Sequence, residues 1–200
     1  MGYTTVKVIF DVSADELNAH VKRHAALYNP RPHVAEDFHI EITAGQHCSA
    51  VWSNHLACPD MFLFPIGHQL AALWMDIRYQ DGDTWDLSCY TAFRNELNHS
   101  VNPWAYDSDF TYDARAEKAV AHRIDKLCKL LPQFADVIRP YMLLWRYAKD
   151  PSRPNELVDR KGKARDSDRY EYGDAYQYFD FLSCFGIDID KPSHRLAMHV

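Results

Sequence analysis

Residues 73–93, LWMDIRYQDGDTWDLSCYTAF, decide which fold the sequence predicts. The first half of this stretch fits a helical stripe and an alternating strand equally well. Asp81-Gly82 then follows, and an Asp-Gly pair between alternating apolar residues is the strongest short-range signal of a β-hairpin. The alternating residues after the turn are Trp85, Leu87, Cys89, Thr91 and Phe93. We therefore predict two antiparallel strands here, the first preceded at most by a helical turn after Pro65.

The stretch before this hairpin predicts more sheet and one helix. Residues 3–10 alternate as a strand, with Val6, Val8 and Phe10 on one side and the polar Thr5 and Lys7 on the other. Ser13 and Glu16 form a capping box, which begins a helix that Asn29-Pro30 ends. Residues 38–43 alternate again, turn at 44–46 and return over 48–53 as a second hairpin.

The second half of the chain changes to helical periodicity. One helix is predicted over residues 113–131. A second apolar stripe, from Phe134 to Trp145 after Pro132, predicts another helix that Pro140 kinks or begins and that packs against the first. Residues 149–169 are rich in proline and in charges of both signs, which is typical of a mobile loop. A last helix over 172–185 ends at Gly186.

These patterns predict an α+β fold. An N-terminal antiparallel sheet, built from two hairpins with an N-terminal strand and helix, occupies residues 1–110. A helical region of about three helices occupies residues 111–200, and the two parts form one compact unit.

Composition excludes several classes of protein. The 200 residues are 47% hydrophobic and carry a formal charge of −6, which indicates a folded chain that repels nucleic acid and anionic membranes. No apolar run reaches the roughly 18 residues that a membrane helix needs. The N-terminus lacks the features of a secretory signal, and five scattered cysteines suit reduced thiols, so a cytoplasmic protein is expected.

The best candidate metal site combines imidazole and thiolate side chains, which suit zinc. Its residues are His47, Cys48, His55 and Cys58. Zinc ligands usually come as two close pairs, and no second pair follows in the sequence, so the main expectation is that no cofactor is bound. His39 and Glu41, on one face of a predicted strand, could join these residues as an acid and base pair.

Aromatic residues interleaved with carboxylates are the most unusual feature of the sequence. We predict that they form a partner-binding surface made of Trp104, Tyr106, Asp107, Asp109, Tyr112, Tyr170, Glu171, Tyr172, Asp174 and Tyr178. Tyrosine and tryptophan supply stiff contact area at interfaces, and neighbouring carboxylates steer a basic partner toward them.

The leading hypothesis is therefore a small protein that acts by protein-protein binding, while catalytic activity stays an open alternative. Such a protein could be an acidic inhibitor, immunity or anti-defence factor that occludes a basic site, and two copies of the chain could also pair. The alternative is a metal-dependent hydrolase or nuclease that uses the histidine, cysteine and glutamate cluster. A nucleic-acid contact through the basic residues of 160–165 is disfavoured, because neighbouring aspartates neutralise them.

Overall fold

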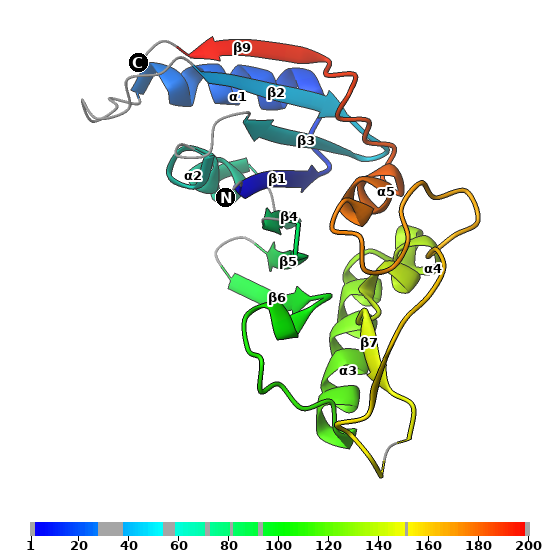
Figure 1. The fold of residues 1–200 in the computed structure, drawn as a ribbon. Helices are drawn as coiled ribbons and strands as arrows, with labels where there is room; N and C mark the ends of the chain where they lie inside the picture. Colours follow the sequence, from blue (N-terminus) through cyan, green and yellow to red (C-terminus); the bar gives the residue numbers. More distant parts are fainter. Residues whose placement is uncertain are drawn as a thin grey trace.

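The computed structural model describes residues 3–27, 38–53, 59–70, 73–80, 82–91, 94–150 and 152–198. Seven strands form one antiparallel sheet in the order β6-β5-β4-β1-β3-β2-β9 (Figure 1). They are β1 (Tyr3–Phe10), β2 (Phe38–Ala44), β3 (Cys48–Ser53), β4 (Leu73–Gln80), β5 (Thr84–Thr91), β6 (Arg94–Ser100) and β9 (His194–Met198). With the helices described below, this sheet confirms the predicted α+β class.

Both predicted hairpins are present. Strands β2 and β3 pair from Ile40 with Ser53 to Ala44 with Ser49. Strands β4 and β5 pair without interruption as far as Gln80 with Thr84, and Gly82 in the turn has a φ of 85°. Residues 73–80 are therefore a strand and not a helix.

The connectivity around β1 is that of a split βαβ motif. Helix α1 (Ala14–Leu27) joins β1 to β2, helix α2 (Pro59–Leu70) joins β3 to β4, and β1 lies between β3 and β4. The helical turn predicted after Pro65 is the last part of the longer helix α2, whereas β6 and β9 were not predicted. Strand β9 comes from the C-terminal end of the chain and pairs with β2 at the sheet edge, Ile40 opposite Leu196.

Alternation along β1 directs apolar side chains to both faces of the sheet. Ile9 joins α1 and α2 in a core that includes Val21 and Trp74. Val6 and Val8 face the other way, into a larger core shared with the C-terminal region. The sheet is therefore a central layer between α1 and α2 on one side and the C-terminal helices on the other (Figure 1).

The C-terminal helices are α3 (Ala114–Leu130), α4 (Ala135–Ile138) and α5 (Gln177–Ser183). Helix α3 is confirmed, and the Oδ1 atom of Asp113 accepts a 2.8 Å hydrogen bond from the amide of Ala116 at its first turn. The second predicted helix, which Pro140 was expected to kink or begin, is shorter than expected: α4 ends at Ile138, because Pro140 lacks an amide hydrogen and disfavours helical backbone at the residue before it. Short 3-10 turns η2 (Pro132–Phe134) and η3 (Arg139–Met142) flank α4 instead.

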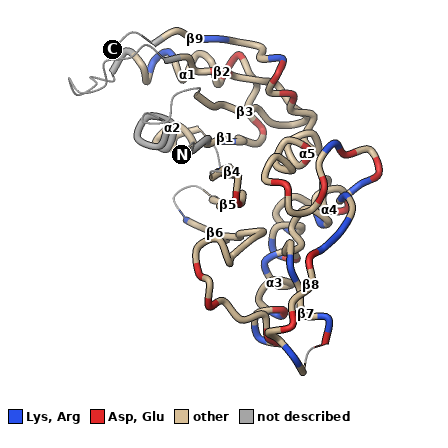
Figure 2. Tube along the Cα trace, viewed as in Figure 1, with Lys and Arg blue, Asp and Glu red and all other residues tan. Residues whose placement is uncertain are grey.

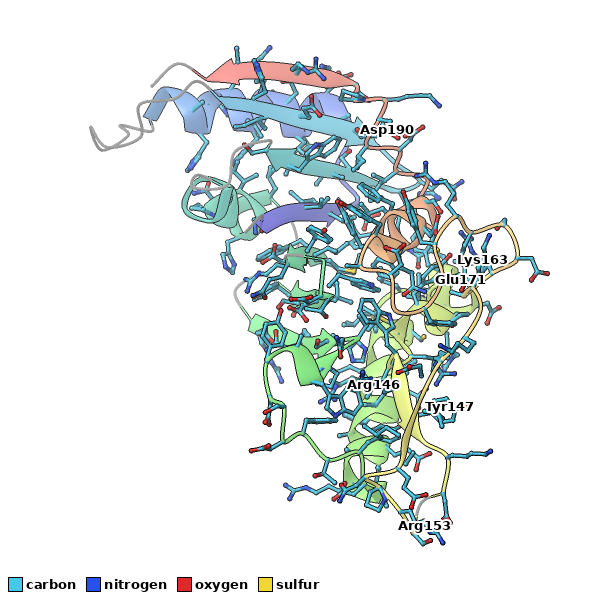
Figure 3. All side chains as sticks on the ribbon, in the orientation of Figure 1. Arg146, Tyr147, Arg153, Lys163, Glu171 and Asp190 are labelled. Atoms are coloured by element: carbon cyan, nitrogen blue, oxygen red, sulfur yellow. The ribbon has the colours of Figure 1, made fainter. Side chains whose placement is uncertain are left out.

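The segment predicted as a loop at 149–169 contains regular structure. Strand β8 (Leu157–Asp159) pairs with β7 (Arg146–Ala148) in a separate two-stranded sheet. Lys163 forms an isolated bridge with Glu171, and the two lie side by side (Figure 3). The buried Asp168 accepts a 2.6 Å hydrogen bond from the hydroxyl of Tyr141. These pairings depend on long-range contacts that the local composition does not predict.

Gly45, in the turn between β2 and β3, lies against the chain segment after α5. An added Cβ there would lie 2.6 Å from the carbonyl oxygen of Phe185, which is closer than van der Waals contact allows. We expect Gly45→Ala to lower the free energy of unfolding by about 1–3 kcal/mol, as overpacking usually does. Urea titration measures this effect, with Ala44→Ser at the exposed neighbouring position as the control. An unchanged unfolding midpoint in Gly45→Ala would contradict the expected clash.

Candidate functional site

The structure divides the predicted partner-binding residues among several places. Trp104 and Tyr172 line one cavity, Tyr106 donates a hydrogen bond to Asp86 on β5, and Tyr170 joins a cluster of rings around α5. Asp107, Asp109 and Glu171 are exposed, whereas Tyr112 and Asp174 are half-buried. These residues therefore have several different neighbourhoods in the fold.

The rings around α5 form an aromatic ladder, which we define as Tyr79, Tyr170, Tyr176, Tyr178 and Phe179. The rings of Tyr79 and Tyr176 stack with centroids 5.3 Å apart and planes inclined by 18°. Tyr176 also stacks on Phe179 at 5.9 Å and 11°. Such ring pairs add about 0.5–1.5 kcal/mol each beyond the burial of their area, so the ladder holds its rings in place.

Exposure within the ladder differs from what the sequence predicted. Tyr178 is only 4% exposed, so a partner cannot reach it. Burial is the main cause that raises its pKa above the ordinary value for tyrosine. Tyr176 is 47% exposed and was missed as an anchor. Since α5 begins at Gln177 and not at 172, Tyr176 precedes the helix and Tyr178 takes an inward position.

Carboxylates surround the exposed part of the ladder. Glu171 is exposed, and the side chain of Asp174 accepts a 2.9 Å hydrogen bond from the amide of Tyr176. Beside the ladder, a cavity of about 650 Å³ is lined by Phe179 and by Asp190, which lies on the segment leading to β9 (Figure 3). Its other lining residues include Arg169, Asp188, Ile189 and Lys191. The ladder therefore adjoins a hollow lined by apolar, acidic and basic side chains, in which Lys191 forms an ion pair with Asp188.

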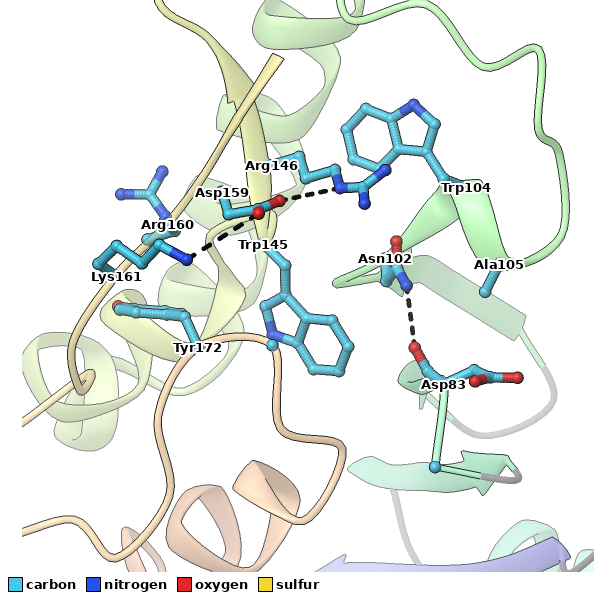
Figure 4. A pocket seen from close by; sticks show the side chains of 12 residues that line it. Asp83, Asn102, Trp104, Ala105, Trp145, Arg146, Asp159, Arg160, Lys161 and Tyr172 are labelled. Carbon is cyan, nitrogen blue, oxygen red and sulfur yellow. Dashed lines mark hydrogen bonds and ion pairs between the residues drawn. The ribbon is translucent and has the colours of Figure 1, made fainter.

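The cavity with Trp104 and Tyr172 has more cations than carboxylates in its lining, whereas the cavity beside the ladder has more carboxylates than cations (Figure 4). It has a volume of about 570 Å³ and includes Trp145, Arg146, Asp159, Arg160 and Lys161. The Nε atom of Arg146 lies 3.1 Å from Asp159, and the guanidinium of Arg160 lies 5.4 Å from the ring of Tyr172. A basic partner is therefore not favoured at this cavity.

The candidate zinc ligands do not converge where the structure describes them. Cys48 is buried, its thiol donates to the carbonyl oxygen of Phe185, and burial raises its pKa to about 12. His47, the neighbouring residue, is exposed. His55 and Cys58 lie outside the described residues. Among the residues that the structure does describe, no three histidine, cysteine or carboxylate side chains are grouped as a metal site.

The alternative acid and base residues both lie on β2. His39 is exposed near the start of β2, and the carboxylate of Glu41 forms an ion pair with Arg195 on β9. This ion pair connects the edge strand β9 with its neighbour β2, two strands that no local sequence pattern relates.

A buried ionic network was missed by the sequence analysis. Lys7 on β1 was expected on the polar side of its strand, but it is fully buried, and its Nζ atom lies 2.9 Å from the carboxylate of Asp76. Arg78 binds the other oxygen of Asp76 at 2.7 Å. The alternation of residues along β1 and β4 could have indicated that Lys7 and Asp76 each point to a given face of their strand. Only the pairing of β1 with β4 places Lys7 directly opposite Asp76.

A second unexpected site lies next to this network, at the sheet edge formed by β6. A cavity of about 480 Å³ there is lined by Arg78, Asp86, Ser88, Asn98, His99 and Arg123, among others. Burial raises the pKa of Asp86, although hydrogen bonds from Tyr106 and Ser100 oppose part of this change. Burial lowers the pKa of His99 to about 3, and the positive charge of Arg123 adds to the effect.

No protein-family model, no curated protein and no solved structure matches this chain. Within the described part of the chain, no helix combines the length and the apolar character needed to cross a lipid bilayer.

Proposed function

We propose that this protein acts by binding another protein, as an acidic inhibitor or immunity-type factor that covers a basic site on its partner. The aromatic ladder and the carboxylates beside it form the contact surface. The observation that carries this proposal is Tyr176, a large ring that is 47% exposed and is held by stacked neighbours.

A ring that is already fixed loses little conformational freedom when a partner binds. Tyr79 and Phe179 stack on Tyr176, and Tyr170 packs near it with a centroid distance of 5.8 Å. Preorganised aromatic side chains of this kind are typical binding hot spots, because the entropy cost of association is reduced.

The charges near the ladder favour a partner rich in arginine or lysine. Glu171, Asp174 and Asp190 contribute negative charge around the rings. The guanidinium of Arg169 lies 5.5 Å from the ring of Tyr170, the kind of cation–π contact that a partner's arginine would make with the exposed ring of Tyr176. Acidic and basic residues alternate along the C-terminal region (Figure 2), so their electrostatic fields partly cancel at a distance. The local group of carboxylates at the ladder therefore directs the partner more than the overall charge of the region does.

Pairing of two copies through the ladder is disfavoured by the same charges. A symmetric contact would place Glu171 and Asp174 of one copy near those of the other, and like charges across an interface cost free energy.

The four cysteines that the structure describes as free thiols are buried, which supports a cytoplasmic setting.

A displayed library of random peptides tests the proposal. The wild-type protein should enrich peptides rich in arginine and lysine. Tyr176→Ala should weaken binding of a selected peptide by at least about tenfold, as expected for a central aromatic anchor. Glu171→Lys should slow association, since it reverses a charge beside the ladder. Affinity and rates are measured by surface plasmon resonance.

Tyr106→Ala is the matched control, because Tyr106 is the other large ring with high exposure, 53%, and lies outside the ladder. This variant should bind the selected peptide as the wild type does. Enrichment of acidic peptides, or equal affinity of the wild type and Tyr176→Ala, would contradict the proposal.

A further inference from the structure

The two edges of the seven-stranded sheet differ in how they are protected. Strand β6, at one edge, has a bulge at Glu96, a residue that the register with β5 leaves without a pairing partner on that strand. The carbonyl oxygen of Glu96 accepts a hydrogen bond from the side chain of Lys126 on α3. Bulges and lysine side chains are devices by which proteins prevent further strands from adding to a sheet edge.

Strand β9, at the other edge, contains neither a bulge nor a lysine. It pairs with β2 in a continuous register over its whole length. In the part of the chain that the structure describes, no strand pairs with its outer side (Figure 1). The charge of Arg195 does not protect this edge, because Glu41 on β2 neutralises it. The outer side of β9 therefore presents backbone N–H and C=O groups with which a further strand can pair.

The side chains of β9 are compatible with pairing to β9 of a second copy. In an antiparallel pair with a two-fold axis at Leu196, each Leu196 lies opposite the other, and Arg195 lies opposite Ala197 of the second copy. The two Arg195 side chains then do not face each other. Leu196 is only partly buried against the core under α1, so this contact also covers apolar surface.

Helix α1 carries charges that match the same two-fold axis. It packs against β2 and β9, and the carboxylate of Asp15 lies 2.9 Å from the ring of His194 on β9. Lys22 follows Asp15 by about two helical turns, so both lie on the side of α1 toward the sheet edge. Asp15, Lys22 and the small Ala19 between them are exposed. Since the axis makes the two α1 helices antiparallel, Asp15 of each copy approaches Lys22 of the other.

We propose that β9 is the interface of a symmetric dimer, in which the β9 strands of two copies pair antiparallel and join the two sheets into one. The two-fold axis passes through the Leu196 pair, perpendicular to the sheet, and places the two α1 helices side by side. The charges favour a second copy over an unrelated strand, because Asp15 and Lys22 meet at two symmetric places. This interface contains no residue of the aromatic ladder and does not depend on the proposed function.

Sedimentation equilibrium over a range of protein concentrations tests the proposal. The wild type should dimerise reversibly. Ala197→Glu should tighten the dimer about two- to tenfold, because it places a carboxylate opposite Arg195 of the other copy at two symmetric places. Ala197→Lys should weaken the dimer by a similar factor, because it places like charges there. The same two substitutions at Ala121, which is exposed on α3, are the controls and should leave dimerisation unchanged.

An exchange of charges tests the contact between the two α1 helices. Lys22→Asp should weaken the dimer, and adding Asp15→Lys in the same chain should restore it, since the pairs then form with their charges reversed. Circular dichroism and thermal unfolding establish that each variant folds.

Amide hydrogen exchange locates the contact, because exchange along β9 should slow as the protein concentration rises. A purified wild type that stays monomeric at every concentration would overturn the proposal, and an unrelated strand as the partner of β9 would give that result. A dimer that Ala197→Glu and Ala197→Lys affect equally, or one that slows exchange only at residues outside β9, would overturn it as well.

Discussion

Lowering the pH from 7 to 4 should reduce the free energy of unfolding of the wild-type protein by about 3 kcal/mol more than that of the His99→Phe variant. The ring of His99 is buried, and its pKa falls to about 3 in the folded protein. In the unfolded chain the same ring takes up a proton below about pH 6.5. The unfolded state therefore binds more protons between pH 6.5 and pH 3, so stability falls as the pH falls through this range.

Urea titrations at pH 7 and pH 4 measure this difference directly. At pH 7, His99→Phe should be as stable as the wild type or more stable, because it removes a buried polar ring without a hydrogen-bond partner. His122→Gln is the control, since His122 is exposed on α3 and should leave the acid sensitivity unchanged. If His99→Phe loses as much stability in acid as the wild type, His99 is not the cause.

Asp76→Asn should destabilise the protein by about 3–5 kcal/mol, because it removes the carboxylate that neutralises the fully buried Lys7. Lys7→Met should cost less, since Asp76 keeps its ion pair with Arg78 at 2.7 Å. The double variant Lys7→Met/Asp76→Leu should be more stable than Asp76→Asn, because it leaves no buried charge. The wild type, Lys7→Met, Asp76→Leu and the double variant form a double-mutant cycle that isolates the coupling between the two side chains.

The exposed pair of Arg139 and Asp125 provides the matched control. Its atoms lie 3.0 Å apart, nearly the same distance as in the buried pair, but both side chains are more than half exposed. Asp125→Asn should therefore change the free energy of unfolding by at most about 1 kcal/mol. Equal costs for Asp125→Asn and Asp76→Asn would contradict the view that burial makes the ionic network of Lys7 important.

Alternation and turn residues were enough to predict much of the sheet. The hairpins at 38–53 and 73–91, the strand over Tyr3–Phe10 and the helix α3 were all predicted from local patterns. These features depend on neighbours within a few residues, so a strand alternates with period 2 and α3 shows a period of 3.6. Gly82 with its positive φ illustrates how one residue type identifies a turn.

The sequence by itself therefore determined the α+β class, both hairpins and α3, because each depends on local periodicity and turn chemistry. Only the tertiary structure decided that β9 pairs with β2, that Lys7 meets Asp76, and that Tyr176 is exposed while Tyr178 is buried. Each of these depends on segments far apart in the chain, or on where a helix begins once it has packed. The cavity at β6 could not be predicted from the sequence for the same reason, since the pairing of β5 with β6 and the packing of α3 bring Asp86, His99 and Arg123 together.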